Sequence, residues 1–154
     1  MSHLLSTIEI EYVGGDIVKP LIEELNRKFK QENISFIHFD LINDTPIKCD
    51  LMICRDCLFH LSYKDTKSVL ENFMKSEIPY LLTTTHKNNE ISFINSDIIT
   101  GDFRLIDLFS PPYNFPTNPL FVIQDWVAPD PERQMCLWNR DQISSVLSRY
   151  LTHS

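Results

Sequence analysis

The first 86 residues alternate short runs typical of strands with longer runs typical of amphipathic helices. Apolar and β-branched residues gather at 8–14, 34–39, 50–54 and 80–85, and helical spacing of apolar residues is found at 20–29 and 62–74. Strands that alternate with helices pair in parallel through right-handed crossovers. We therefore expect an α/β fold with a mostly parallel sheet and helices on both of its faces.

Both helical runs begin with recognisable signals. Pro20 suits the first turn of a helix, where its missing N–H group costs nothing. Ser62 and Asp65 have the spacing of a capping box. The apolar stripes that would face the sheet are Leu21, Ile22, Leu25 and Phe29 in the first helix, and Val69, Leu70, Phe73 and Met74 in the second.

The pattern changes beyond Gly101. A proline-rich loop at 110–116 is followed by two strand-like runs, 120–125 and 135–138, which flank a turn at 129–131. These runs predict an antiparallel hairpin added to the parallel sheet. A closing helix is indicated by Ile143, Val146, Leu147 and Tyr150. With no internal repeat or linker, we expect residues 1–154 to form one domain.

Glycine is scarce. The chain has only Gly14, Gly15 and Gly101, whereas an average chain of this length has about eleven glycines. Neither G-x-G-x-x-G nor G-x-x-x-x-G-K-[ST] can be written with these positions, so a complete nucleotide-binding loop of either common type is absent. We expect the adjacent Gly14 and Gly15 to end the first strand.

The charge balance argues against polyanionic partners. Fourteen Lys and Arg residues against 21 Asp and Glu residues give a net charge of −7, and the basic residues form no cluster. Binding to nucleic acid or to an anionic membrane needs clustered positive charge, so we expect neither. No apolar run approaches the length of a membrane span, and Met1-Ser2-His3 does not begin a signal peptide. We expect a cytoplasmic protein.

Four cysteines allow a weaker hypothesis. Cys54 and Cys57 have redox or zinc-knuckle spacing, but Cys49 and Cys136 do not provide the second pair of a structural zinc site. We expect no bound metal and interpret the thiols as reduced packing residues. A redox role for Cys54 and Cys57 stays open.

Acidic residues follow the predicted strands. Asp16 comes after the first, Asp40 ends the second, and Arg55-Asp56 follows the third. In open α/β sheets, ligands bind beyond the carboxyl ends of the strands, and one carboxylate can accept hydrogen bonds from both hydroxyls of a ribose. Aspartate is also common in ordinary turns, so each position alone is ambiguous.

Together the three segments carry a family resemblance. Residues 12–18, 36–41 and 49–62, with their spacing, resemble the middle of a class I S-adenosylmethionine-dependent methyltransferase. The resemblance covers roughly residues 11–86 and implies a Rossmann-like sheet, S-adenosylmethionine as cofactor and a small-molecule acceptor. The cofactor residues that it implies are Asp16 for the ribose, Ile17 for the adenine, Asp40 with Leu41 for the adenine amino group, and Arg55, Asp56 and Cys57 for the methionine end.

Methyl transfer to a hydroxyl or an amine can require a base, for which position suggests His60, Asp56 and His86. Ser110-Pro111-Pro112-Tyr113 resembles a motif of methyltransferases that act on planar nitrogen groups, but it lies far from the place of that motif in the family. We interpret it as a loop near the acceptor pocket. Residues that could line this pocket are Tyr113, Phe115 and Trp126.

The chain departs from the family at its start. The family begins with a strand, a G-x-G-x-G loop and a helix, whereas eleven residues without glycine precede Tyr12. The fold is thus expected to be N-terminally truncated relative to the family. Three hypotheses remain: a methyltransferase, an impaired relative whose sheet is completed by another copy in a homodimer or by a partner, and an unrelated α/β module that uses Cys54 and Cys57.

Overall fold

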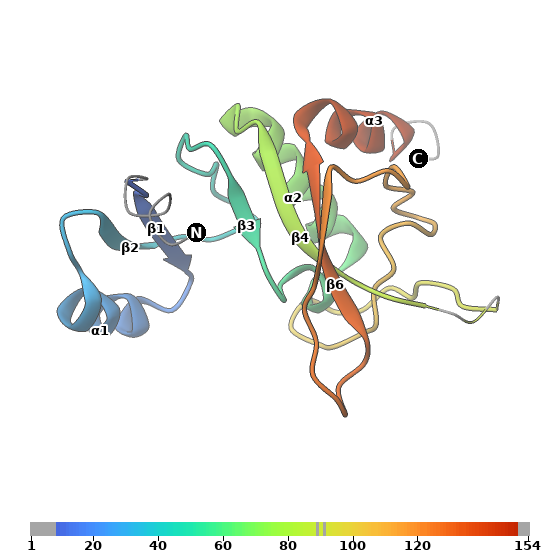
Figure 1. The fold of residues 1–154 in the computed structure, drawn as a ribbon, viewed down its shortest axis with the longest axis horizontal. Helices are drawn as coiled ribbons and strands as arrows, with labels where there is room; N and C mark the ends of the chain where they lie inside the picture. Colours follow the sequence, from blue (N-terminus) through green and yellow to red (C-terminus); the bar gives the residue numbers. More distant parts are fainter. Residues whose placement is uncertain (1–8, 89, 91, 151–154) are drawn as a thin grey trace, which may run out of the picture. The chain divides into compact units, whose positions relative to one another are not determined.

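The computed structural model describes residues 9–88, 90 and 92–150, which divide into two compact units (Figure 1). The first unit extends to Asp44 and the second begins at Thr45. The expectation of one domain over residues 1–154 stays a prediction. No helix in the described part of the chain is long and apolar enough to cross a membrane.

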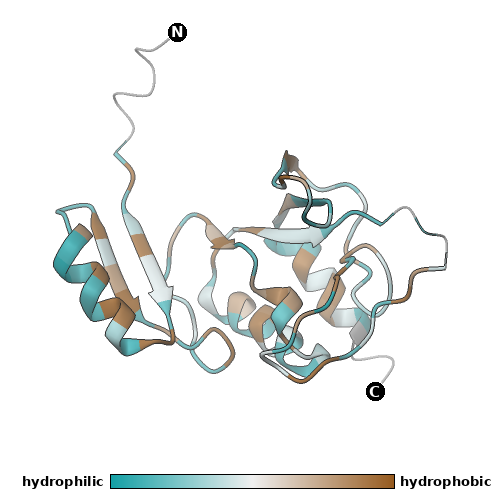
Figure 2. Cartoon of the chain, turned by 90° about the horizontal axis from the view of Figure 1, so that it is seen from below, coloured by the Kyte–Doolittle hydropathy of each residue, from teal (hydrophilic) through white to brown (hydrophobic). Residues whose placement is uncertain are grey.

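The first unit is a β-α-β element. It consists of β1 (Tyr12–Asp16), α1 (Lys19–Phe29) and β2 (Ile34–His38). The strands pair in parallel from Tyr12 opposite Ile34 to Asp16 opposite His38, as the sequence predicts. Helix α1 packs against both strands, begins with Pro20 in its first turn, and turns its hydrophilic residues away from them (Figure 2).

The two adjacent glycines lie inside β1, so the expectation that they end the strand is wrong. A Cβ atom on Gly14 would lie 2.7 Å from the ring of Phe36, and one on Gly15 would lie 3.1 Å from the Cβ of Phe39. Two phenylalanine side chains therefore pack directly on the strand backbone. Glycine is needed here for close packing and not for a turn.

The second unit contains a four-stranded sheet in the order β3-β4-β6-β5. Strands β3 and β4 are parallel, whereas β6 is antiparallel to both β4 and β5. The predicted parallel pair and C-terminal antiparallel hairpin are thus confirmed. The elements are β3 (Met52–Cys54), η2 (Leu58–His60), α2 (Tyr63–Ser76), β4 (Tyr80–His86), β5 (Phe121–Gln124), β6 (Arg133–Asn139) and α3 (Arg140–Tyr150).

Helices α2 and α3 contact each other and cover one face of this sheet (Figure 1). The predicted cap of α2 is confirmed, because the Ser62 hydroxyl accepts a hydrogen bond from the Asp65 N–H (3.1 Å). The core beneath the helices includes the fully buried side chains of Val69, Leu70, Phe73, Leu81, Trp138, Ile143 and Val146.

Because the chain has few glycines, other residues adopt left-handed backbone conformations. Glu77 ends α2 with a φ of +62°, and Asp56 and Asn114 have φ values of +53° and +48°. Such positions usually favour glycine, although Asp and Asn tolerate them better than most residues. Asp56 is the one that lies among the predicted site residues.

Candidate functional site

The carboxyl ends of β1 and β2 carry the acidic residues of the first unit. The N–H of Phe39 donates to the backbone carbonyl of Asp16 (3.0 Å), which holds the two strand ends side by side. The Asp16 carboxylate accepts one hydrogen bond, from the Val18 N–H (2.8 Å). Ile17 beside it is 59% exposed. Asp16 and Ile17 are therefore presented at this edge.

Asp40 lies at the same edge, two residues beyond β2, and is followed by the half-buried Leu41. Its carboxylate accepts hydrogen bonds from the Ile42 N–H (2.9 Å), the Asn43 N–H (3.2 Å) and the Asn43 side chain (2.8 Å). The side-chain bond from Asn43 lowers the pKa of Asp40 most. The structure thus brings Asp16, Ile17, Asp40 and Leu41 to one edge, with Asp40 held as a carboxylate.

In the second unit, the parallel β3 and β4 end at a common edge. Arg55 follows β3 and forms two hydrogen bonds with Asp125, from Nε to Oδ2 (2.8 Å) and from Nη2 to Oδ1 (3.1 Å). Asp125 follows β5, which runs parallel to β4 because both are antiparallel to β6. The pair raises the pKa of Arg55 and lowers the pKa of Asp125, so both side chains stay charged.

Asp56 is held by several contacts. Its N–H donates to the Thr84 hydroxyl (2.9 Å), and its carboxylate lies 3.2 Å from the Arg133 guanidinium. The backbone and the carboxylate of Asp56 are therefore both engaged by neighbouring residues. The general-base role expected from the sequence stays a prediction.

Two thiols, Cys54 and Cys57, lie at this edge and contact each other. Cys57 donates to the Arg55 carbonyl (3.2 Å), and its hydrogen bond to Cys54, with burial, raises the pKa of the Cys54 thiol well above its usual value. A raised pKa keeps a thiol protonated and unreactive. Among the described residues, no group of three His, Cys, Asp or Glu side chains could hold a metal ion.

His60 is held through its ring and its backbone. Its Nδ1 lies 2.8 Å from the backbone carbonyl of Asp102, and its own carbonyl accepts a hydrogen bond from the Gly101 N–H (2.8 Å). A carbonyl can only accept, so we assign the proton to Nδ1. The Nε2 atom then keeps its lone pair. The ring packs against Phe59 and Phe103, with centroids 4.5 and 5.9 Å away.

His86, at the end of β4, has the opposite tautomer. Its Nδ1 accepts a hydrogen bond from the Ile106 N–H (3.1 Å), so the proton of the neutral ring is on Nε2. Burial lowers the pKa of His86 and keeps the ring neutral. The two histidines therefore carry the proton of the neutral ring on different nitrogen atoms.

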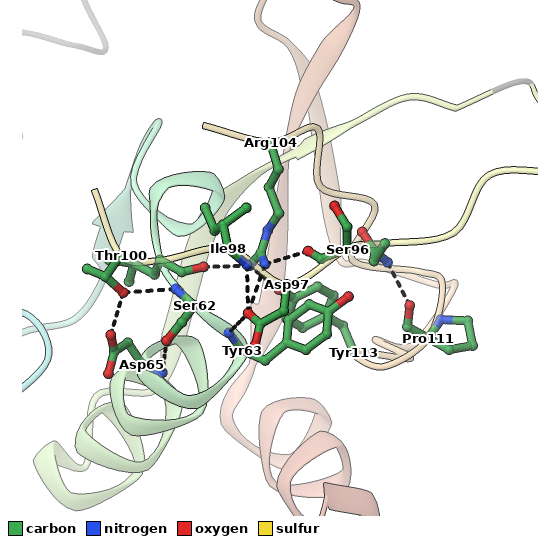
Figure 3. A network of polar contacts seen from close by, with 12 residues as sticks. Ser62, Tyr63, Asp65, Ser96, Asp97, Ile98, Thr100, Arg104, Pro111 and Tyr113 are labelled. Atoms are coloured by element: carbon green, nitrogen blue, oxygen red, sulfur yellow. Dashed lines mark hydrogen bonds and ion pairs between the residues drawn. The ribbon is translucent and has the colours of Figure 1, made fainter. Parts of the chain in front are cut away.

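A polar network fixes the loop that holds His60 (Figure 3). The buried Arg104 guanidinium donates to the Leu61 carbonyl (2.6 Å), the Ser96 carbonyl (2.8 Å) and the Tyr113 hydroxyl. It also lies 3.6 Å from the Asp97 carboxylate. One buried side chain thus ties the loop to the segment that follows His60.

The same loop caps the start of α2 (Figure 3). The Asp97 carboxylate accepts from the Tyr63 N–H (2.7 Å), and the Thr100 hydroxyl accepts from the Ser62 N–H (2.9 Å) and contacts Asp65. These bonds set the position of Asp102, which orients His60. Neither Arg104 nor Asp97 was predicted from the sequence. The signal for Arg104 is a charged residue inside the apolar run 103–106.

The proline-rich segment is a loop, as predicted, but its aromatic residues pack in the core. Tyr113 and Phe115 are 1% and 2% exposed, so they are packing residues, as is common for aromatic residues beside prolines, and do not line a pocket. Burial raises the pKa of Tyr113 to about 12. Phe115 packs against Trp138 with ring centroids 4.8 Å apart. Trp126 alone of the three is partly exposed, at 38%.

The fold is similar to solved structures. Magnesium protoporphyrin IX methyltransferase from Synechocystis, with bound S-adenosylhomocysteine, aligns at a TM-score of 0.57 and 12% identity over 83% of this chain. The 1,6-didemethyltoxoflavin-N1-methyltransferase of Burkholderia thailandensis aligns at 0.60 and 11% over 84%. An enzyme described as catalysing a pericyclic reaction aligns at 0.60 and 8% over 87%. No protein-family model and no curated protein sequence matches the chain.

The alignments extend beyond the second unit. Residues 45–154 make up 110 of 154 residues, about 71% of the chain, so coverage of 83–87% includes residues of both units. The chain spans 63%, 60% and 37% of the lengths of these three structures. The likeness to them concerns the fold.

Proposed function

Because the chain has the fold of the class I S-adenosylmethionine-dependent methyltransferases, we propose that it binds S-adenosylmethionine and transfers the methyl group to a small-molecule acceptor. The observation that carries the proposal is the likeness across residues of both units to structures with bound S-adenosylhomocysteine. This fold supports the methyltransferase hypothesis over that of an unrelated α/β module. A fold can host several chemistries, so the site must carry the rest of the argument.

The edge of the first unit fits the nucleoside part of this cofactor. A carboxylate offers on the order of four lone-pair positions, and the Val18 N–H uses one at Asp16. The remaining positions can accept hydrogen bonds from the two ribose hydroxyls. Three hydrogen bonds occupy Asp40, which leaves room for one donor such as the adenine amino group. The exposed Ile17 and the half-buried Leu41 offer apolar contact to the base.

We assign the methionine end to the segment Arg55, Asp56 and Cys57. The side chains of Arg55 and Asp56 are matched by Asp125 and Arg133, so this segment offers a fixed backbone more than free charges. A rigid edge suits a reaction whose main requirement is alignment. The cofactor, when bound, supplies a methyl group on a positively charged sulfur that reacts by in-line displacement.

His60 is the base in this proposal. Its Nε2 lone pair can accept a proton from a hydroxyl or a protonated amine of the acceptor, while the Nδ1–H bond to Asp102 keeps the ring oriented. Phe59 and Phe103 pack against the ring and help to hold its orientation. Asp56 has a positioning role, and His86 can donate a hydrogen bond from Nε2.

Calorimetry with S-adenosylmethionine tests the cofactor part of the proposal. We expect Asp16→Ala to weaken binding by about 10- to 100-fold, because two hydrogen bonds to a charged group are lost. Asp50→Ala is the matched control, since it removes an exposed aspartate outside the site. The protein should include any residues that its gene encodes upstream of Met1. A folded protein of this kind that gives no binding signal would contradict the proposal.

The strand pairing favours a second candidate, an interaction domain. Among the described residues of its own unit, β1 pairs only with β2, and β3 likewise pairs only with β4, so each strand has one edge without a partner in its unit. Open edges bind extended segments, so another copy or a partner could complete the sheet. Hydrogen exchange tests this candidate. Protection of the amides along both open edges in a monomer that shows no partner would contradict it.

A further inference from the structure

Strand β5 is an exposed apolar edge of the second unit. All four of its residues are exposed, with Phe121 at 59%, Val122 at 41% and Ile123 at 42%. The apolar character continues on both sides, where Leu120 is 52% and Trp126 is 38% exposed. Single exposed apolar residues are ordinary, but a continuous run on an edge strand indicates an interaction site.

This edge lacks the features that usually prevent pairing. Phe121–Gln124 contains no charge, no proline and no glycine. Asp125 follows, but its charge is matched by the two bonds from Arg55. The other open edge of the sheet is different, since β3 has three residues and is followed directly by Arg55. Of the two edges, β5 is the longer and the less charged.

The backbone N–H and C=O groups of every second residue of β5 are directed to the open edge of the sheet, where they can pair with another strand. The Asp125 N–H donates to the Arg133 carbonyl on β6 (3.3 Å). Because successive residues of a strand point their backbone groups to opposite sides, the N–H groups of Gln124 and Val122 are directed to the open edge. A strand that docks there would gain hydrogen bonds without disturbing the β5–β6 pairing.

An apolar row crosses the sheet from this edge. The register places Phe121 beside Leu137, Leu137 beside Leu82, and Leu82 beside Ile53. These side chains alternate with Leu81 and Trp138, which point into the core. The row therefore lies on the face opposite the core, and it ends at Ile53, which is 57% exposed.

We propose that the chain forms a homodimer in which β5 pairs with β5 of a second copy, antiparallel about a two-fold axis. The contact is uncharged although each copy has a net charge of −7, so it keeps the repelling charges outside the interface. A two-fold axis makes this contact self-complementary and closed, which limits the assembly to two copies. The four-stranded sheets then join into one continuous sheet.

The exposed area suits a weak dimer. If the five exposed apolar residues at the β5 edge each contribute roughly 80–100 Å², the contact buries about 400–500 Å² per copy, given that an aromatic side chain buries about 150–250 Å² in full. The total of about 900 Å² lies in the range of weak, transient protein interfaces.

Sedimentation equilibrium of the full chain over a range of concentrations tests the proposal. We expect a species of twice 18.1 kDa that dissociates on dilution. Ile123→Lys should weaken the dimer by about 10- to 100-fold, because a buried isoleucine is replaced by a charge. Ile99→Lys is the matched control, since Ile99 is 80% exposed in a loop and the substitution changes the net charge equally. It should leave the dimer intact.

A second variant tests the backbone pairing. Val122→Pro removes an N–H that points to the open edge and should also give monomers. Circular dichroism establishes whether each variant is folded. If Val122→Pro does not fold, the result for Ile123→Lys decides the outcome. Several results would overturn the proposal: a monomer at every concentration, an Ile123→Lys dimer of unchanged affinity, assemblies that keep growing beyond two copies, or a dimer that Ile53→Lys breaks and Ile123→Lys does not.

Discussion

The two units have similar strand and helix patterns but very different cores. Ile22 is the one described apolar residue of the first unit that is buried, whereas the second unit buries Phe73, Trp138 and many others. Phe29 on α1 is 53% exposed, although its spacing matches that of a core residue. A correct strand register does not require a packed core, and short β-α-β elements gain little stability on their own.

The two units also differ in their proposed functions, and this difference follows the difference in their cores. The first unit presents carboxylates for cofactor binding on an edge with little buried apolar surface. The second unit holds His60 on a loop fixed by the buried Arg104. We infer that binding depends mainly on groups of the first unit, and that the chemical step depends on the rigid second unit.

The largest expected effect is on turnover. His60→Gln should lower kcat by about 10²- to 10⁴-fold, because glutamine can donate to the Asp102 carbonyl but cannot accept the proton of the acceptor. Transfer of a labelled methyl group to a panel of small hydroxyl and amine compounds measures this effect. Calorimetry should show unchanged S-adenosylmethionine binding, the reverse of Asp16→Ala. A variant with full kcat would remove His60 from the chemistry.

A matched pair of substitutions measures the difference between the cores. Phe73→Ala on α2 should destabilise the protein by about 3–5 kcal/mol, because it leaves a cavity in the packed second unit. Phe29→Ala on α1 should cost less than about 1 kcal/mol, because the ring is largely exposed. Urea unfolding followed by fluorescence and circular dichroism gives both values. Equal losses would show that the first unit has a core that its exposures do not reveal.

The smallest expected effect concerns pH. Burial lowers the pKa of His86, so the unfolded chain takes up a proton there before the folded one does. Stability is therefore full above the unfolded pKa of about 6.5 and falls as the pH drops through it. His86→Gln should flatten this loss between pH 7 and pH 5, as measured by urea unfolding at each pH.

Nitrogen-detected NMR provides a direct check on the two histidines. We expect the proton of His60 on Nδ1 and that of His86 on Nε2. The same tautomer for both would contradict the assigned roles.

Local signals in the sequence predicted the elements well. The alternation of strand and helix patterns, the cap at Ser62 and the hairpin at residues 121–139 are all present. Periodicity also identified the buried stripe of α2, because Val69, Leu70 and Phe73 recur at the helical repeat. The interpretation of Gly14 and Gly15 was wrong because the aromatic residues that press on them are distant in the sequence.

The sequence by itself determined the order of elements, the acidic residues at strand ends and the absence of a glycine-rich loop, since these depend on residue type and local spacing. Only the tertiary structure decided which of those groups are already bound to a hydrogen-bond or ion-pair partner. Arg133 lies 77 residues from Asp56 in the chain, yet it forms an ion pair with that carboxylate. Asp102 sets the tautomer of His60 through a backbone carbonyl, which no side-chain pattern reveals. Reactivity here depends on hydrogen-bond partners, and the fold brings those partners together.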